Sequence, residues 1–179
     1  MNISAEGLCD AAQYIATPNC DARPPDTAIE LLVIHNISLP PGDFGGTAVI
    51  DLFLNRLDPG AHPYFAGIAT LRVSAHFLVR RDGKLLQFVP CAMRAWHAGQ
   101  SLWRGRARCN DFSIGIELEG ADDVAFSDAQ YTCLGALAGA LYARYPIAAS
   151  VGHSDIAPGR KTDPGPHFAW ARYFQHVNK

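Results

Sequence analysis

The chain has 179 residues, 49% of them apolar, and a formal net charge of −2 at pH 7. This length favours one domain spanning residues 1–179, with enough apolar side chains to bury a core. The sequence has no basic block, so we expect neither nucleic-acid binding nor binding to an anionic membrane surface. No run of about 18 apolar residues occurs, so we expect no membrane span.

Cysteine usage and the start of the chain indicate the compartment. The five cysteines are widely spaced and form no CxxC pair, which supports neither a disulfide scaffold nor a thiolate zinc site. Residues 1–21 lack the basic start and the apolar stretch of a signal peptide. We therefore expect a cytoplasmic protein, and we expect it to act as a monomer.

The first half of the chain is expected to begin with an irregular lead-in, residues 1–26. Residues 29–34 then form an almost unbroken apolar run, which is typical of a central strand buried on both faces. The proline- and glycine-rich residues that follow indicate a loop, and a short helix is expected over 48–57. Strands are expected over 73–80 and 85–89, because these residues flank an Asp-Gly hairpin signal.

In the second half, residues 112–119 alternate between apolar residues and small or polar ones, which predicts a strand with two different faces. Ser127 and Gln130 have the spacing of a capping box, and the helix they open is expected to reach about Arg144. A last helix is expected over 168–177. Strands that alternate with helices, with one hairpin among them, predict an α/β fold with a central mixed sheet flanked by helices.

Three side chains that are far apart in the sequence form a candidate metal site. His35 follows the apolar run 29–34, and His153 follows a second short stretch, 149–152. Asp163 precedes a proline, which pushes it toward an extended conformation. Two imidazoles at strand ends and one carboxylate on a restrained loop make a three-ligand site with an open position, which is how catalytic zinc is held. Spacing alone leaves Asp155 and His167 as rival ligands.

Two further residues are candidates for the chemistry. In an extended segment Lys161 projects beside Asp163, where it could stabilise an oxyanion; the alternative is an ordinary surface lysine. Glu117 lies on the small-residue face of the strand 112–119, where Gly115 leaves room above the sheet. A carboxylate there can take a proton from water and return it to a leaving amine. Glu119 lies on the same face and is an equal candidate from alternation alone.

Several other side chains could contact a substrate. His97 lies in a predicted loop and could touch a ligand, as could His62, whereas His76 falls within an apolar strand and is interpreted as structural. Trp96 could stack on a sugar ring or fill the core. Arginines could also bind the carboxylates of an acidic ligand, although each could equally be a solvated surface residue; they are Arg72, Arg104, Arg106 and Arg108.

Six blocks of the sequence, in their order along the chain, are specific to one enzyme family. They are VIHNISLPPG (33–42), AHPYFAG (61–67), VSAH (73–76), RAWHAG (94–99), CNDFSIGIELEG (109–120) and GHSDIAPGRKTDPGP (152–166). These blocks resemble those of the zinc-dependent N-acetylmuramoyl-L-alanine amidases. The resemblance covers nearly the whole chain, although the first twenty residues match weakly. It is nearest to the cytoplasmic branch that acts on 1,6-anhydro-muropeptides in Gram-negative cell-wall recycling.

The resemblance implies that zinc is held by His35, His153 and Asp163, that Glu117 is the acid/base residue, and that Lys161 assists the oxyanion. Some phage and eukaryotic members use a cysteine where Asp163 stands here, so the aspartate favours the bacterial recycling branch. The implied reaction is hydrolysis of the amide between (1,6-anhydro-)N-acetylmuramic acid and L-alanine of the stem peptide. The alternative is a non-catalytic muropeptide-binding receptor on the same fold, which usually lacks the third ligand. The resemblance also implies substrate contacts at Asn36, Tyr64, Arg72, Ala95 and Arg108.

Overall fold

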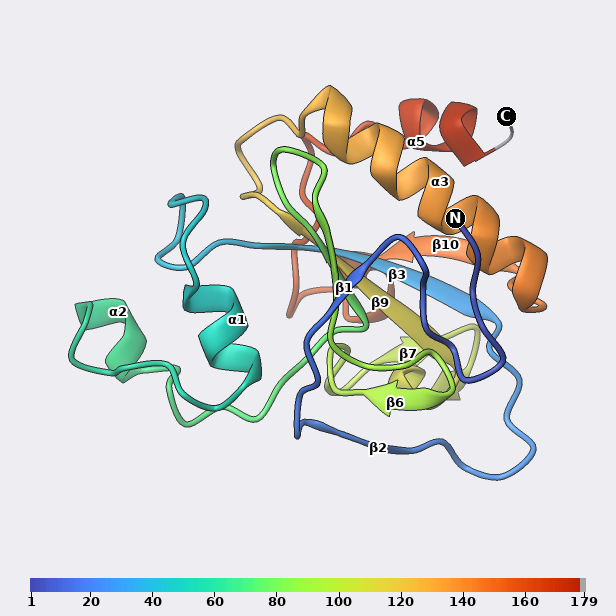
Figure 1. The fold of residues 1–179 in the computed structure, drawn as a ribbon, viewed down its shortest axis with the longest axis horizontal. Helices are drawn as coiled ribbons and strands as arrows, with labels where there is room; N and C mark the ends of the chain where they lie inside the picture. The colour runs from blue at the N-terminus through green and yellow to red at the C-terminus, as the bar shows by residue number, and fades with distance from the viewer. Residues whose placement is uncertain (178–179) are drawn as a thin grey trace.

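A six-stranded mixed β-sheet forms the centre of the computed structural model, which describes residues 1–177 (Figure 1). In spatial order its strands are β1 (Gln13–Tyr14), β5 (Leu85–Gln87), β4 (Phe77–Val79), β9 (Ser113–Glu119), β3 (Leu31–Ile37) and β10 (Ala149–Gly152). Strands β4, β9, β3 and β10 run parallel to one another, and β5 runs antiparallel to β4. The predicted α/β fold, with a central mixed sheet and flanking helices, is confirmed, as is the predicted hairpin.

The two central strands are the most deeply buried part of the sheet. All seven residues of β9 are buried, as are the first five of β3, because neighbouring strands and both outer layers cover them. The predicted strand 29–34 is present but extends to Ile37, so His35 lies within the strand rather than after it. The register places His35 directly opposite Glu117 on the adjacent parallel strand.

Helices and apolar side chains cover both faces of the sheet. Helices α3 (Asp128–Arg144) and α5 (Trp170–Val177) lie together over one face (Figure 1). Alternation along β4 separates two hydrophobic clusters: Phe77 packs in the cluster that includes α3, whereas Leu78 packs with α1 (Ala48–Phe53). The site described below therefore rests on strands that are supported from both sides.

Local sequence signals determine where the helices begin and end. The predicted capping box is present: Ser127 Oγ accepts from the Gln130 amide, and the Gln130 side chain accepts from the Ser127 amide. Helix α3 ends at Arg144, as predicted. Helix α1 is shorter than the predicted 48–57, and Asn55 beyond its end has a left-handed backbone (φ 58°), which a continuing helix does not permit.

The N-terminal segment is more ordered than the expected irregular lead-in. Strand β1 pairs in parallel with β5 at the sheet edge, and β2 (Cys20–Ala22) pairs antiparallel with β6 (Met93–Ala95). The buried Gln87 side chain accepts from the Cys9 amide at 2.8 Å and donates to the Gly7 carbonyl at 2.7 Å. A strand of two or three residues is too short to show periodicity in the sequence. β1 and β2 form because they pair with β5 and β6, which lie far away in the sequence.

Other short elements were also not predicted, and they lie in the connections between the longer strands and helices. They are α2 (Pro63–Ala66), α4 (His153–Ile156), the 3₁₀ turn η1 (Cys109–Asp111) and the strand pair β7 (Leu102–Trp103) and β8 (Arg106–Ala107). The last helix begins at Trp170, two residues later than expected.

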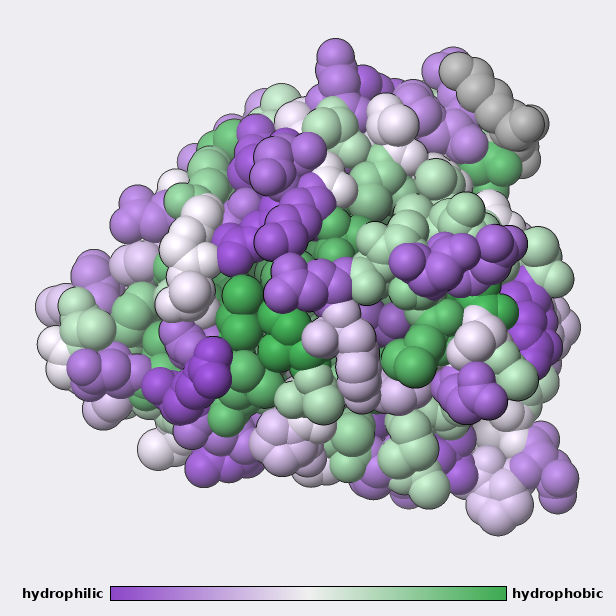
Figure 2. All heavy atoms as spheres, viewed as in Figure 1, coloured by the Kyte–Doolittle hydropathy of each residue, from purple (hydrophilic) through white to green (hydrophobic). Residues whose placement is uncertain are grey.

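The surface carries scattered apolar residues. In the face shown in Figure 2, strongly hydrophobic residues are visible in patches among hydrophilic ones. Most of the large apolar residues lie in the core. Among residues 1–177, no helix has the length and apolar character needed to cross a membrane. The five cysteines are free thiols.

Candidate active site

The fold brings three side chains from distant parts of the chain to one point. His35 Nδ1 lies 2.9 Å from Asp163 Oδ2, His153 Nδ1 lies 3.1 Å from the same oxygen, and the two Nδ1 atoms are 3.0 Å apart. Strands β3 and β10 are parallel neighbours, so His35 and His153 emerge near the same edge. The loop that carries Asp163 is tied to this edge by a hydrogen bond from the Ser154 amide to the Asp163 carbonyl.

The donor set fits a divalent metal ion. His153 Nε2 lies 3.1 Å from the Ala98 carbonyl, which only accepts hydrogen bonds, so a neutral His153 carries its proton on Nε2. Its Nδ1 then presents a lone pair to the carboxylate oxygen of Asp163, and two such groups repel each other unless a cation lies between them. Two imidazole nitrogens and a carboxylate oxygen are common zinc ligands.

The rival ligands are not part of this cluster. Asp155 Oδ2 accepts from the Gly152 amide at 2.7 Å, where it caps the short helix α4. His167 is exposed and is not among the side chains whose donor atoms gather here. The residues that the structure gathers are His35, His153 and Asp163. Burial lowers the pKa of His35, which favours the neutral imidazole that a metal requires.

Glu117 lies beside the cluster with an unused carboxylate oxygen. As the register partner of His35 it shares a face of the sheet with that residue, and it lines the cavity in front of the cluster. Its Oε2 is buried and has no hydrogen-bond partner within the described part of the chain. Burial raises the pKa of Glu117 well above its usual 4.5, and the negative charge of Asp163 raises it further. A carboxyl with a raised pKa is suited to exchange a proton near neutral pH.

Glu119, the equal candidate from alternation, is committed elsewhere. Its Oε1 accepts from Arg80 Nη1 at 2.8 Å and from the Gly45 amide at 2.7 Å. The other oxygen accepts from the Arg81 amide at 3.1 Å. The structure therefore separates two carboxylates that the strand pattern could not distinguish.

The cavity in front of the cluster has a volume of about 630 Å³. Lys161 is exposed and lines the cavity together with Asp163. Part of the cavity wall is apolar and was not identified from the sequence. Its residues come from α1 and from the connection after α2; they include Leu52, Phe53, Ile68 and Leu71.

Three of the six predicted substrate contacts line the cavity: Asn36, Tyr64 and His97. The Asn36 amide nitrogen donates to Asp122 Oδ1 at 2.6 Å. Asp122 lines the cavity too and was not predicted, although it follows the carboxyl end of β9, where ligands of parallel sheets commonly bind.

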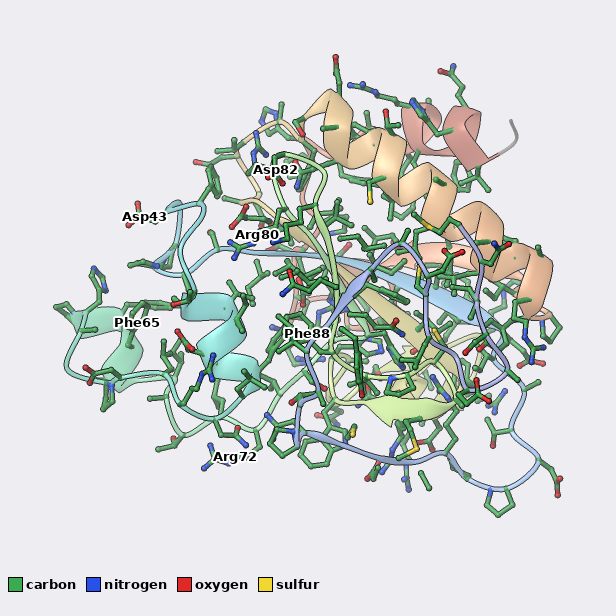
Figure 3. All side chains as sticks on the ribbon, in the orientation of Figure 1. Asp43, Phe65, Arg72, Arg80, Asp82 and Phe88 are labelled. Atoms are coloured by element: carbon green, nitrogen blue, oxygen red, sulfur yellow. The ribbon has the colours of Figure 1, made fainter. Side chains whose placement is uncertain are left out.

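The structure does not bring the other three predicted contacts to the cavity wall. Arg72 points outward at the edge of the molecule and donates to the Thr70 carbonyl (Figure 3). Ala95 is fully buried within β6, where it packs in the apolar cluster that contains Leu78 and α1. Arg108 is 71% exposed at its side chain and pairs with Asp111.

One interpretation from the sequence needs correction. The space above Gly115 does not stay open for Glu117, because the His97 ring fills it: a Cβ atom on Gly115 would lie 2.4 Å from His97 Cγ. Burial lowers the pKa of His97 well below its usual value, so this imidazole is neutral. His76 is also buried, and its Nδ1 accepts from the Gly115 amide at 3.0 Å, in keeping with the structural role predicted for it.

Comparison with known proteins identifies the family. The sequence profile of the N-acetylmuramoyl-L-alanine amidases matches residues 25–166. The chain belongs to this family. The amidase is 59% identical over 170 residues to the 1,6-anhydro-N-acetylmuramyl-L-alanine amidase AmpD of Citrobacter freundii, a match that covers 94% of this chain and 91% of the relative. AmpD of Escherichia coli strain K12 is 57% identical over 176 residues, which cover 97% and 96% of the two chains.

Solved structures agree with this assignment. A crystal structure of a selenomethionine derivative of AmpD matches with a TM-score of 0.96 and 58% identity, covering 99% of each chain. The Escherichia coli amidase AmiD, in complex with anhydro-N-acetylmuramic acid-L-Ala-D-γ-Glu-L-Lys, matches at 34% identity with a TM-score of 0.63 and covers 97% of this chain and 65% of its own. The resemblance predicted from the sequence is confirmed, and the protein is an N-acetylmuramoyl-L-alanine amidase.

Proposed function

We propose that this amidase uses zinc to hydrolyse the amide between 1,6-anhydro-N-acetylmuramic acid and L-alanine of the stem peptide, in peptidoglycan recycling. The observation that carries the proposal is the convergence of His35, His153 and Asp163, whose donor atoms lie within 4.8 Å of one another. The unpartnered carboxylate oxygen of Glu117 beside this cluster supplies the group that such a reaction needs.

His35, His153 and Asp163 are the residues that would hold zinc. Bound there, the ion would supply Lewis acidity, which polarises a carbonyl and makes water a better nucleophile at neutral pH. The remaining chemistry belongs to the protein. Since His35, His153 and Asp163 all line the cavity, the scissile amide can approach the cluster from the solvent side.

Glu117 would move the proton. It accepts a proton from the attacking water and returns it to the nitrogen of the departing alanine, which leaves as a free amine. The raised pKa of Glu117 makes its carboxylate a better proton acceptor than an exposed glutamate. Lys161 lines the same cavity, where its ammonium group would donate to the carbonyl oxygen as that oxygen gains negative charge.

The substrate class is supported by relatives and by the cavity. Relatives at 57–59% identity are named 1,6-anhydro-N-acetylmuramyl-L-alanine amidases, and AmiD was solved with an anhydromuramoyl-tripeptide. The cavity offers an apolar wall and polar groups at Asn36 and Asp122, which suits a ligand that joins a sugar to a peptide. The cytoplasmic location and the monomeric state expected from the sequence stay predictions.

Peptide release from a defined muropeptide tests the proposal. Purified protein is incubated with anhydromuramoyl-tripeptide, with and without a chelator, and free tripeptide is followed by mass spectrometry. We expect release that stops on chelation and returns with added zinc. Release that persists after verified metal removal would refute the mechanism. No release from any muropeptide, despite measurable binding, would favour a receptor.

A further inference from the structure

Each histidine of the cluster turns one ring nitrogen toward the other ligands and the second nitrogen toward a single short segment. His35 Nε2 lies 2.9 Å from His97 Nδ1, and His153 Nε2 lies 3.1 Å from the Ala98 carbonyl. The two contacts come from consecutive residues. The segment 97–98 therefore touches both imidazoles on the side away from the predicted metal.

The side chains of Asn110 and Arg160 fix the backbone of this segment. Asn110 Oδ1 accepts from two consecutive backbone amides, that of His97 at 3.1 Å and that of Ala98 at 2.8 Å. Arg160 Nη2 donates to the Ala98 carbonyl at 2.8 Å and to the Gln100 carbonyl at 2.6 Å. Arg160 thus fixes the Ala98 carbonyl that meets His153, and Asn110 fixes the backbone amide of the same residue.

The His97 ring has a closely defined position. It packs against Gly115, where any larger residue would overlap the ring, and its edge-to-face contact with His35 has a centroid distance of 5.0 Å. Its Nε2 lies 3.2 Å from Ser113 Oγ. Both ring nitrogens of His97 thus have partners, one at the metal cluster and one on β9.

We infer that residues 97–98, fixed by Asn110, orient both histidines for metal binding, and that His97 is a positioning residue that fixes the tautomer of His35. The inference rests on the proposed zinc site. A ligating Nδ1 needs a free lone pair, so the proton of His35 must be on Nε2, where His97 Nδ1 accepts it. His97 then carries its own proton on Nε2 and donates it to Ser113 Oγ. For His153 the Ala98 carbonyl has the same role.

The affinity for zinc and the position of the His35 proton test this inference. His97→Phe retains a ring against Gly115 but removes the acceptor, and we expect the zinc Kd to rise about 10- to 100-fold in competition with a chromophoric chelator. His97→Gln restores an acceptor oxygen and should recover part of the loss. His167→Phe, at an exposed histidine outside the cluster, should bind zinc as the wild type does.

In NMR spectra of the zinc-loaded wild type, the Nε2 proton of His35 should be observable; in His97→Phe it should be lost to exchange.

Each result has a definite meaning. Wild-type affinity in His97→Phe, with the His35 Nε2 proton retained, would overturn the inference and leave the zinc site intact. A wild type that binds no zinc, or a His35→Ala variant that binds it unchanged, would instead refute the proposed function. If His97→Phe does not fold, the zinc affinity of Asn110→Ala is compared with that of Asn110→Asp. The alanine removes the oxygen that accepts from the His97 and Ala98 amides, and the aspartate keeps it. A weaker zinc affinity is expected for Asn110→Ala alone, and equal affinities in the two variants would overturn the inference.

Discussion

Glu117 and Glu119 show how two residues with the same position in a pattern acquire different chemistry. Both side chains lie on one face of β9, and both are buried. Arg80 and two backbone amides satisfy Glu119, whereas Glu117 has a free oxygen next to the cluster. Alternation reports the face of a strand but not the partners that fold over it. The choice between them therefore required either the resemblance or the structure.

Substituting the predicted acid/base residue should abolish turnover without emptying the metal site. We expect Glu117→Gln to lower kcat on anhydromuramoyl-tripeptide by about 10²–10⁴-fold, the usual contribution of a general acid/base. The zinc Kd should stay at the wild-type value, because Glu117 is not among the three gathered donors. Full activity in a zinc-loaded Glu117→Gln would reassign the proton transfer to another group.

The same substitution should change how stability depends on pH. The pKa of Glu117 is raised in the folded protein, so between about pH 4.5 and that raised value the folded chain holds a proton that the unfolded chain has released. The free energy of unfolding should therefore fall as pH rises through this window. Urea titrations of chelator-treated protein should show a smaller fall in Glu117→Gln. Parallel curves for the two proteins would mean that burial does not perturb this carboxyl.

The sequence left Lys161 with two possible roles, an oxyanion donor or an ordinary surface lysine, because single lysines usually lie at the surface. Exposed at the cavity wall, it is positioned to serve a substrate rather than the fold. We expect Lys161→Ala to lower kcat by about 10²–10³-fold, as for loss of an oxyanion donor, with unchanged thermal stability. Unchanged turnover with zinc retained would return Lys161 to the class of surface lysines.

At the level of elements, long patterns were predictable and short ones were not. β3 was predicted from its nearly unbroken apolar run, β9 from its alternation, and α3 from its capping box. β1 and β2 have two and three residues, and strand partners distant in the sequence define them. α4 has four residues, too few to show helical periodicity. For the same reason the cavity wall from α1 and the connection after α2 could not be derived from spacing.

Arg23 shows what the N-terminal segment contributes. Its guanidinium donates to four backbone carbonyls, those of Cys91, Asn110, Asp111 and Ser113. Asn110 and Asp111 belong to η1, and Ser113 begins β9. A lysine cannot make this set of bonds, so we expect Arg23→Lys to lower the free energy of unfolding in urea by about 2–4 kcal/mol. Arg56→Lys, in an exposed pair with Asp51, is the matched control and should change it by at most about 0.5 kcal/mol. Equal effects would mean that Arg23 is not an anchor.

At the scale of the molecule, the proposed metal site connects separate parts of the chain, since its residues come from β3, the start of α4 and the loop that follows. Zinc binding should therefore stabilise the whole fold. At free zinc a thousandfold above Kd the gain is about 4 kcal/mol. Calorimetry should show the Tm falling by roughly 10 °C on chelation. His35→Ala should show no such response, and a similar shift in that variant would mean that zinc acts at another site.

Anomalous X-ray diffraction at the zinc edge, from crystals of the purified protein, tests the central claim most directly. The account predicts one strong peak bonded to Nδ1 of His35, Nδ1 of His153 and a carboxylate oxygen of Asp163, at about 2.0–2.2 Å from each. A peak whose ligands include Asp155 or His167 in place of one of these three would contradict it, as would crystals of active protein with no zinc at this point.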